Sequence, residues 1–227
     1  MEGSRQVGGE RRRRRRPEEA ERAILAAARA FLSEHPFREM KVEDVMARTG
    51  LSRPAFYAYF KDRYELVTRL LEGIGGLLFA VDRRWLLGDP GVGGEESAGI
   101  LREALRGGAE TFERYGPVLR AISDAASYDR RVEEVYRFGL IERLIVAVTD
   151  RISRDIEAGV SPPDLDPRET ARALVFMTER YLIDAYGTSS PSKGDAGDAV
   201  VRTLEAVWTS TLYGPTTEAG ERAGGER

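Results

Sequence analysis

Apolar residues recur every three or four positions along most of this chain, and this spacing is typical of helices that bury one face. The earliest clear stripe follows Pro17, a residue that suits the first turn of a helix. No segment alternates apolar and polar residues convincingly, as a half-buried strand would. We therefore expect an all-α fold of about nine helices. The first stripe consists of Ile24, Leu25, Ala28, Phe31 and Leu32.

Glycine and proline divide the expected helices. His35 precedes Pro36, and a residue before proline disfavours the α region, so the first helix should end there. Gly116-Pro117 is expected to separate two later helices, and Asp166-Pro167 to begin another as a cap followed by a first-turn proline. The expected helices cover residues 17–35, 42–48, 52–60, 62–87, 96–114, 117–127, 129–158, 167–187 and 195–213.

The composition disfavours several classes of function. The 227 residues include no cysteine and a single histidine, His35. Disulfide frameworks, thiolate metal sites, cysteine nucleophiles and histidine-dependent catalysis are therefore poor candidates, and we predict no enzyme activity, no metal and no cofactor. No run approaches the ~20 apolar residues of a membrane span, and the N-terminus lacks an apolar signal-peptide core, so we expect a cytoplasmic protein.

Charge is distributed unevenly along the chain. Residues 1–90 carry a net charge of +4 and residues 91–227 a net charge of −7, although the whole chain has only −3. Six of the N-terminal positive charges form one run, Arg11 to Arg16. This run is either a solvated tail or an arm that reaches DNA phosphates or a minor groove. A basic front end joined to an acidic remainder favours a nucleic-acid contact near the N-terminus.

Residues 18–60 have the proportions of a helix-turn-helix unit. In such a unit a tight glycine turn separates two short helices, and a supporting helix precedes them. The second short helix would enter the major groove, where Arg53 can bind guanine bidentately. Hydroxyls at Thr49, Ser52, Tyr57 and Tyr59 would bind phosphates. Free backbone amides at the start of the next helix would also favour an anion. A plain three-helix core without a ligand is the alternative. The candidate DNA contacts are Lys41, Thr49, Ser52, Arg53, Pro54, Ala55, Tyr57, Tyr59, Lys61 and Arg63.

The stretch KVEDVMARTGLSRPAFYAYFKDRYEL, residues 41–66, resembles the signature of TetR-family repressors. The matching segments are Gly50-Leu51-Ser52 and Phe56-Tyr57-Ala58-Tyr59-Phe60. The resemblance implies that Tyr57 contacts the DNA backbone and that Phe60 anchors the core. Met46 and Thr49 stand where the family usually has alanines, and Arg63 where a lysine is usual, so the phosphate contact of that lysine is in doubt.

The same resemblance implies a homodimer, formed through the last two helices, that binds a pseudo-palindromic double-stranded operator. Apolar positions in these two helices would supply the interface, although the sequence does not separate residues that face a partner from residues of the protomer's own core. These positions are Leu174, Leu182, Val200, Leu204 and Val207.

The C-terminal half resembles one member of the family in which a long apolar tunnel runs along the sensing helices. The similar segments are Met177-Thr178-Glu179-Arg180, Val207-Trp208-Thr209-Ser210 and Leu212-Tyr213-Gly214, together with Ser52-Arg53-Pro54. The likeness implies a hydrophobic small-molecule effector, with few charges in its site. Each candidate is at least as well explained as a core residue, because an apolar stripe at helical spacing more often belongs to a core than to a pocket. The implied lining residues are Thr178 and Trp208, with Ile183 nearby and, by looser alignment, Leu101, Leu105, Phe112, Tyr136, Leu140 and Val175.

These observations predict a ligand-responsive transcriptional repressor that a hydrophobic molecule releases from its operator by a population shift. A helical protein-interaction adaptor that does not bind DNA is the alternative. We expect a disordered basic arm over residues 1–16, the helix-turn-helix domain over 17–62, the ligand-binding and dimerisation domain over 63–213, and a flexible tail over 214–227. The run Gly73-Ile74-Gly75-Gly76 indicates either a close helix approach or a soft point in the fourth helix.

Overall fold

A computed structural model describes residues 17–89, 93–188 and 190–214. Helices, turns and irregular segments make up these residues, with no strand among them, so the all-α prediction is confirmed. The predicted basic arm, including Arg11 to Arg16, and the tail from residue 215 onward lie outside the described residues. None of the described helices combines the length and the apolar character needed to cross a bilayer.

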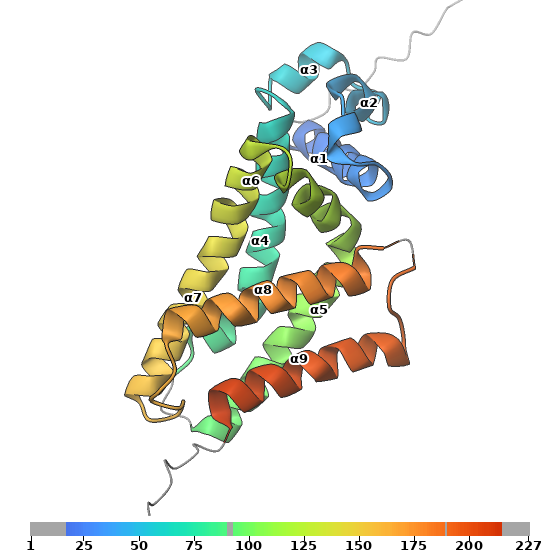
Figure 1. The fold of residues 1–227 in the computed structure, drawn as a ribbon. Helices are drawn as coiled ribbons and strands as arrows, with labels where there is room; N and C mark the ends of the chain where they lie inside the picture. The colour runs from blue at the N-terminus through green and yellow to red at the C-terminus, as the bar shows by residue number, and fades with distance from the viewer. Residues whose placement is uncertain (1–16, 90–92, 189, 215–227) are drawn as a thin grey trace, which may run out of the picture.

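Three helices form the N-terminal unit at one end of the molecule (Figure 1): α1 over Pro17–Glu34, α2 over Val42–Ala47 and α3 over Arg53–Tyr57. The spacing of apolar residues in α1 places Ile24 and Phe31 on its buried face. The helix α1 ends before His35, since a residue that precedes proline disfavours the α region, and a 3₁₀ turn over Phe37–Glu39 follows.

The helix α4, Arg63–Leu87, leaves this unit and runs into the body of the molecule, where it packs against α5, α6 and α7 (Figure 1). Asp62 caps its first turn by accepting hydrogen bonds from the amides of Tyr64 and Glu65. The buried face of α4 extends from Leu66 to Leu86, so one helix contributes to the packing of both parts of the chain.

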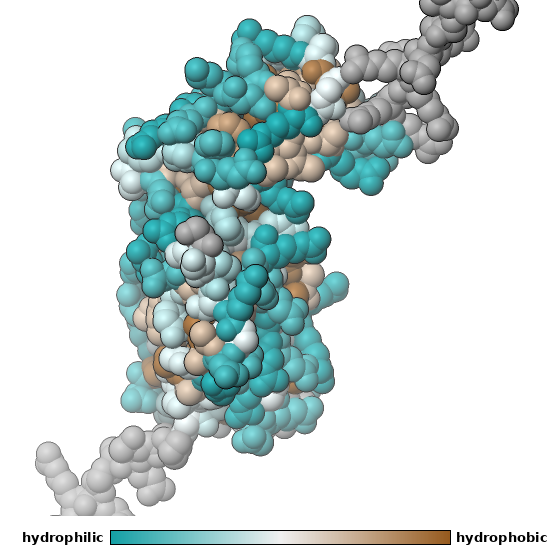
Figure 2. Space-filling model, turned by 90° about the vertical axis from the view of Figure 1, so that its right-hand side faces the viewer, coloured by the Kyte–Doolittle hydropathy of each residue, from teal (hydrophilic) through white to brown (hydrophobic). Residues whose placement is uncertain are grey.

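The body consists of α5 over Gly94–Ala126, α6 over Arg130–Tyr136, a π-helical segment over Arg137–Ile141, α7 over Glu142–Glu157, α8 over Pro167–Tyr186 and α9 over Asp195–Tyr213. The helices α8 and α9 lie side by side across α5 (Figure 1). In the view of Figure 2 the N-terminal unit projects beyond the body, and the visible surface is mostly hydrophilic with small separate apolar patches.

The predicted break at Gly116-Pro117 is wrong, because α5 continues through it as one helix of 33 residues. A proline inside a helix costs about 3 kcal/mol. Burial of the next turns, at Val118, Leu119 and Ile122, offsets this cost. Gly116 lies so close to α8 that an added Cβ would stand 2.6 Å from the carbonyl oxygen of Tyr186. The glycine therefore serves close packing between helices and does not end the helix.

The helix predicted over 129–158 is present, but a π-helical turn in its middle divides it into α6 and α7. Residues 137–141 take π-helical geometry, a form that is rare and often found at functional sites. This turn buries Leu140 and Ile141 and leaves Phe138 60% exposed.

A buried ionic cluster joins α4, α5, α7 and α9. Arg151 is 2% exposed and Asp155 is fully buried, and the guanidinium donates to the carboxylate over 2.8 Å. Arg151 also donates to the backbone carbonyls of Trp85 and Gly88 and to the Ser97 hydroxyl, while the Tyr213 hydroxyl donates to Asp155. Asp155 is therefore paired in spite of its burial.

The structure divides the apolar positions of α8 and α9 between core and surface. Leu174, Leu182, Val200 and Leu204 are buried in the protomer's own core, so they are not available to a partner. Val207 is exposed. The other exposed large apolar side chains of these two helices are Phe176 and Tyr181.

The glycine run of α4 gives a matched set of substitutions. An added Cβ at Gly73 or Gly76 meets no atom within 4 Å, whereas at Gly75 it stands 3.1 Å from Cδ1 of Leu140 in the π-helical segment. We expect Gly73→Ala and Gly76→Ala to raise the free energy of unfolding by up to about 1 kcal/mol. Gly75→Ala should gain less, because Leu140 must shift. Equal gains at all three positions in urea denaturation would contradict a close approach at Gly75.

Candidate DNA interface and effector cavity

The turn between α2 and α3 is set by two residues. Gly50 has a φ of 67°, the left-handed conformation that glycine adopts without strain. The Thr49 hydroxyl donates to the carbonyl of Met46 and accepts from the amide of Leu51. Its proton is used inside the turn in the free protein, so a bond from Thr49 to a phosphate would require the hydroxyl to leave the Met46 carbonyl.

The short helix α3 is held from one side by Phe56, which is fully buried and packs 5.5 Å, centroid to centroid, from the ring of Phe60. This anchoring leaves Arg53 and Tyr57 on the outer face, and Tyr57 is 51% exposed. Ser52 occupies the N-cap position without making a side-chain capping bond. The exposed residues of this region that were predicted to contact DNA are Lys41, Ser52, Arg53, Pro54, Tyr57 and Lys61.

Arg53 has internal partners in the free protein. Its guanidinium forms an ion pair with Glu43 of α2 over 3.0 Å and lies 3.4 Å from the Tyr57 hydroxyl. Both interactions lie at the surface, where an ion pair contributes only about 0–1 kcal/mol. A guanine or a phosphate could therefore displace Glu43 at little cost.

The structure does not place the other predicted DNA contacts on this outer face. Ala55 and Tyr59 are partly buried and pack against the hydrophobic core. Arg63 turns inward, donates to the carbonyl of Met40 over 3.2 Å and lies 4.5 Å from the centre of the Phe37 ring. These residues hold the unit together.

The predicted anion site at the start of α4 is already filled by the protein's own carboxylates. Asp62 accepts from the amides of Tyr64 and Glu65, and the Glu65 carboxylate accepts from the amide of Lys61 over 2.7 Å. Partial burial opposes ionisation, but these amides and Arg131 lower the pKa of Asp62. An external anion would meet a negative charge here instead of free amides.

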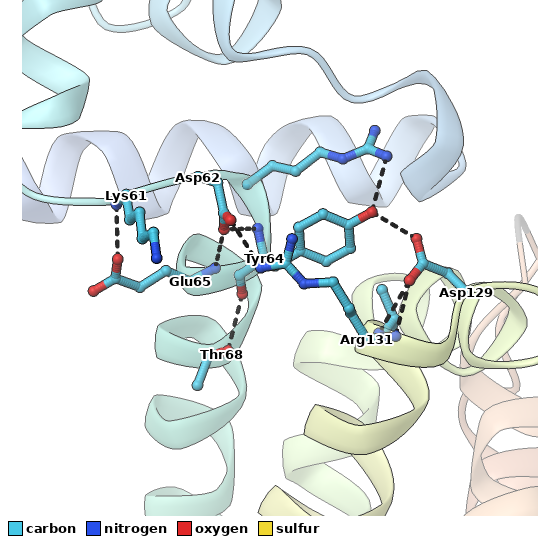
Figure 3. A network of polar contacts seen from close by, with 9 residues as sticks. Lys61, Asp62, Tyr64, Glu65, Thr68, Asp129 and Arg131 are labelled. Carbon is cyan, nitrogen blue, oxygen red and sulfur yellow. Dashed lines mark hydrogen bonds and ion pairs between the residues drawn. The ribbon is translucent and has the colours of Figure 1, made fainter.

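A polar network joins the start of α4 to the start of α6 (Figure 3). Arg131 donates to Asp62 over 2.8 Å, and its guanidinium lies 3.8 Å from the centre of the Tyr64 ring. The Tyr64 hydroxyl donates to Asp129, the capping residue of α6, over 2.8 Å. These contacts tie the end of α4 that carries the N-terminal unit to a helix of the body. We call the contacts among Asp62, Tyr64, Asp129 and Arg131 the α4–α6 network.

The body contains a cavity of about 80 Å³ between α4, α5, α8, α9 and the α6–α7 segment. Its wall is mainly apolar and aromatic. Ligand sites typically measure about 300–1,000 Å³, so a drug-sized molecule would have to push the walls apart. The lining residues are Leu78, Asp82, Trp85, Leu101, Ala104, Leu105, Gly108, Phe112, Tyr136, Leu140, Ile141, Leu144, Val148, Val175, Thr178, Glu179, Leu182 and Trp208.

Eight of the nine predicted ligand-binding residues line this cavity. They are Leu101, Leu105, Phe112, Tyr136, Leu140, Val175, Thr178 and Trp208. Ile183 is buried but does not line the cavity. Trp208 donates from its indole nitrogen to the Thr178 hydroxyl over 2.8 Å, and its ring meets that of Trp85 edge-on at 5.9 Å.

Two acidic residues of the lining were missed at the sequence level. Glu179 accepts from the Tyr136 hydroxyl over 2.5 Å, and burial together with this carboxylate raises the pKa of Tyr136. Asp82 lies on the face of α4 that also carries Leu78 and Trp85. The spacing of four and three residues to these apolar neighbours was the available signal, since it places all three on one helix face.

Burial raises the pKa of Asp82 from its ordinary value of 3.8 to about 7. The folded state thus binds this proton more tightly than the unfolded state, and the stability of the wild type should fall as the pH rises from about 4 to about 7. Asp82→Asn removes this loss. We expect the variant to exceed the wild type in free energy of unfolding above pH 7 and to approach it toward pH 4. A difference that does not change with pH would contradict the raised pKa.

Comparisons with known proteins agree with both halves of this geometry. Residues 24–70 match the N-terminal domain of bacterial regulatory proteins of the tetR family, and residues 101–214 match the C-terminal domain of the transcriptional regulator EthR. The HTH-type transcriptional regulator EthR of Mycolicibacterium smegmatis is 28% identical over 215 residues, which cover 93% of this chain and 94% of that protein. EthR of Mycobacterium tuberculosis is 28% identical over 206 residues, covering 91% and 93%.

Solved structures share the fold. A TetR-family regulator from Syntrophomonas wolfei has a TM-score of 0.73 at 16% identity and covers 90% of this chain and 100% of its own. GusR of Salmonella enterica has a TM-score of 0.71 at 19% identity, with 88% and 98% covered. The helix-turn-helix match lies on α1 to α4 and the EthR-type match on the helices around the cavity. The chain is therefore a transcriptional regulator of the TetR family, with a C-terminal domain of the EthR type.

Proposed function

We propose that this regulator is a repressor that binds a pseudo-palindromic operator as a homodimer and leaves it when a hydrophobic small molecule enters the cavity. Residues 17–62 would read DNA, and residues 63–213 would bind the effector and the second protomer. Lys41, Ser52, Arg53, Pro54, Tyr57 and Lys61 are the proposed DNA contacts.

One observation carries this proposal: α4 belongs to both sites. Its start holds the helix-turn-helix unit through Arg63, which donates to the carbonyl of Met40, and through Tyr64, whose ring lies 5.5 Å from that of Phe37. Its far half forms a wall of the cavity through Leu78, Asp82 and Trp85. Because the cavity is smaller than a typical effector, occupancy must displace its walls. A shift of α4 would move each recognition helix away from the half-site spacing that the operator requires.

The proposed dimer interface uses the exposed apolar side chains of α8 and α9. Phe176, Tyr181 and Val207 are each more than a third exposed, although residues of this kind are usually covered. A C₂ pair formed through these two helices would bury the same patch on both protomers.

The α4–α6 network supports a route by which the cavity could reach the DNA-binding unit. We expect Arg131→Gln, which removes the ion pair to Asp62, to leave effector affinity unchanged but to reduce the effector-induced loss of operator affinity severalfold. Couplings of this kind are usually about 1–3 kcal/mol. Arg130→Gln is the control, since Arg130 is exposed and pairs with Glu134 of its own helix. Equal induction of the two variants in fluorescence-anisotropy titrations would show that the network does not transmit the signal.

The proposal is tested by footprinting the purified protein on DNA from around its own gene. Protection of two half-sites about one helical turn apart, lost in Tyr57→Phe and Arg53→Ala, is the expected result. A genome-wide selection that also returned no preferred sequence would refute operator binding and favour the adaptor alternative.

A further inference from the structure

Asp82 is one of two acidic residues in the wall of a mainly apolar cavity. It lies between Leu78 and Trp85 on one face of α4, and these neighbours also line the cavity. Among the described residues, no hydrogen-bond donor or cation pairs with its carboxylate. The lining contains no lysine, arginine or histidine.

Two other carboxylates of the body, the fully buried Asp155 and the partly buried Glu179, are paired. Asp155 accepts hydrogen bonds from the Arg151 guanidinium and the Tyr213 hydroxyl, and Glu179 accepts one from the Tyr136 hydroxyl. Asp82 is partly buried, and an unpartnered carboxyl group costs stability when it loses part of its hydration. An apolar side chain at position 82 would avoid that cost. The carboxyl group of Asp82 is thus unexplained by packing or by folding.

We propose that the effector is a hydrophobic amine whose protonated nitrogen binds Asp82 while its apolar body lies against the aromatic wall. This inference rests on the proposed function and names the class of molecule that the cavity takes. A cation in the cavity would gain an ion pair with Asp82 in a poorly solvated place, where such pairs are stronger than at the surface.

The rest of the wall is suited to the same class of molecule. Phe112 and Tyr136 are aromatic residues of the lining, and aromatic rings attract both apolar groups and cations. Glu179 adds a second acidic group, so an anionic ligand such as a fatty acid would meet two carboxylates and no compensating positive charge. The cavity therefore selects by charge as well as by hydrophobicity.

The chain carries its own probe of cavity occupancy. It has two tryptophans, and both Trp85 and Trp208 line the cavity. A change in intrinsic tryptophan fluorescence therefore reports binding at this place without a label.

The test uses three molecules with one body and different head groups: phenylbutylamine, phenylbutanol and phenylbutyrate. The full chain is titrated with each, and dissociation constants are taken from the fluorescence. We expect the wild type to bind the amine at least about tenfold more tightly than the alcohol, with the carboxylate weakest. Asp82→Asn should abolish the preference for the amine and leave the affinity for the alcohol within about twofold.

Two variants control for place and for charge. Gly108→Phe fills the cavity from α5, where an added Cβ meets no atom within 4 Å, and should abolish binding of all three molecules. Asp150→Asn removes the same charge from an exposed position of α7 and should keep the preference for the amine.

The outcomes separate this inference from the proposed function. Equal affinity of the wild type for amine and alcohol, with both lost in Gly108→Phe, would overturn the cationic effector and leave the cavity as the ligand site. A preference for the amine that persists in Asp82→Asn or in Gly108→Phe would overturn the role of Asp82. Operator binding, measured separately by footprinting, is unaffected by either result.

Discussion

Arg151→Met is expected to lower the free energy of unfolding by about 3–5 kcal/mol, the cost of removing one partner of a buried ion pair. The substitution leaves Asp155 fully buried without its cation. It also removes the Arg151 hydrogen bond to the carbonyl of Trp85 and one of the two arginine hydrogen bonds to the carbonyl of Gly88, at the point where α4 ends. Methionine has a similar volume and keeps the apolar contacts, so the loss reports the ionic cluster. Denaturation in urea at a fixed protomer concentration measures it, because dimerisation makes stability depend on concentration.

The double variant Arg151→Met/Asp155→Leu is the control for this prediction. Removing both charges abolishes the uncompensated carboxylate, so the double variant should recover most of the stability that Arg151→Met loses. If the single and the double variant were equally unstable, the cost would come from the lost carbonyl contacts and not from Asp155. A single variant as stable as the wild type would contradict the buried pair altogether.

Arg53→Ala is expected to weaken binding to the preferred operator by about 1–3 kcal/mol for each half-site, which corresponds to tenfold for every 1.4 kcal/mol. Arg53 is exposed at the start of α3, and its partner Glu43 is held only by a surface ion pair. Binding to unrelated DNA should change much less, because phosphate contacts remain. Anisotropy titrations with operator and scrambled duplexes separate the two effects.

Two further variants test this prediction: one should change operator affinity in the opposite direction, and one is a charge control. Glu43→Gln removes the competitor for the Arg53 guanidinium and should strengthen operator binding slightly. Arg83→Ala removes one positive charge from an exposed position of α4 outside the helix-turn-helix unit and should leave the discrimination unchanged. The same loss on operator and scrambled DNA in Arg53→Ala would make Arg53 a phosphate contact and not a base contact.

The helix-turn-helix and the all-α fold could be predicted because their signals are local. The glycine turn at Gly50, the four-residue spacing of Phe56 and Phe60, and the cap at Asp62 each act within a few residues. The break predicted at Gly116-Pro117 was wrong because contacts with α8 and burial after Pro117 outweigh a local preference.

Side-chain roles were harder to predict because they depend on partners distant in sequence. Arg63 suggested a phosphate contact, yet its guanidinium donates to the carbonyl of Met40, 23 positions earlier. Asp82 was not singled out, since only the assembled cavity shows that no cation faces it. The buried Arg151 was likewise invisible, because arginine is normally a surface residue and its four acceptors come from α4, α5 and α7 and the turn after α4.

The central claim, that the cavity and the DNA-binding unit are coupled through α4, is tested most directly by measuring the affinity of an effector for the free protein and for the operator-bound protein. Thermodynamic linkage requires operator to weaken effector binding by the same factor by which effector weakens operator binding. We predict equal factors of at least about fivefold. In Gly108→Phe the effector should no longer bind, and adding it should not change the affinity for operator. An effector that binds the cavity with the same affinity whether or not operator is bound would contradict the account.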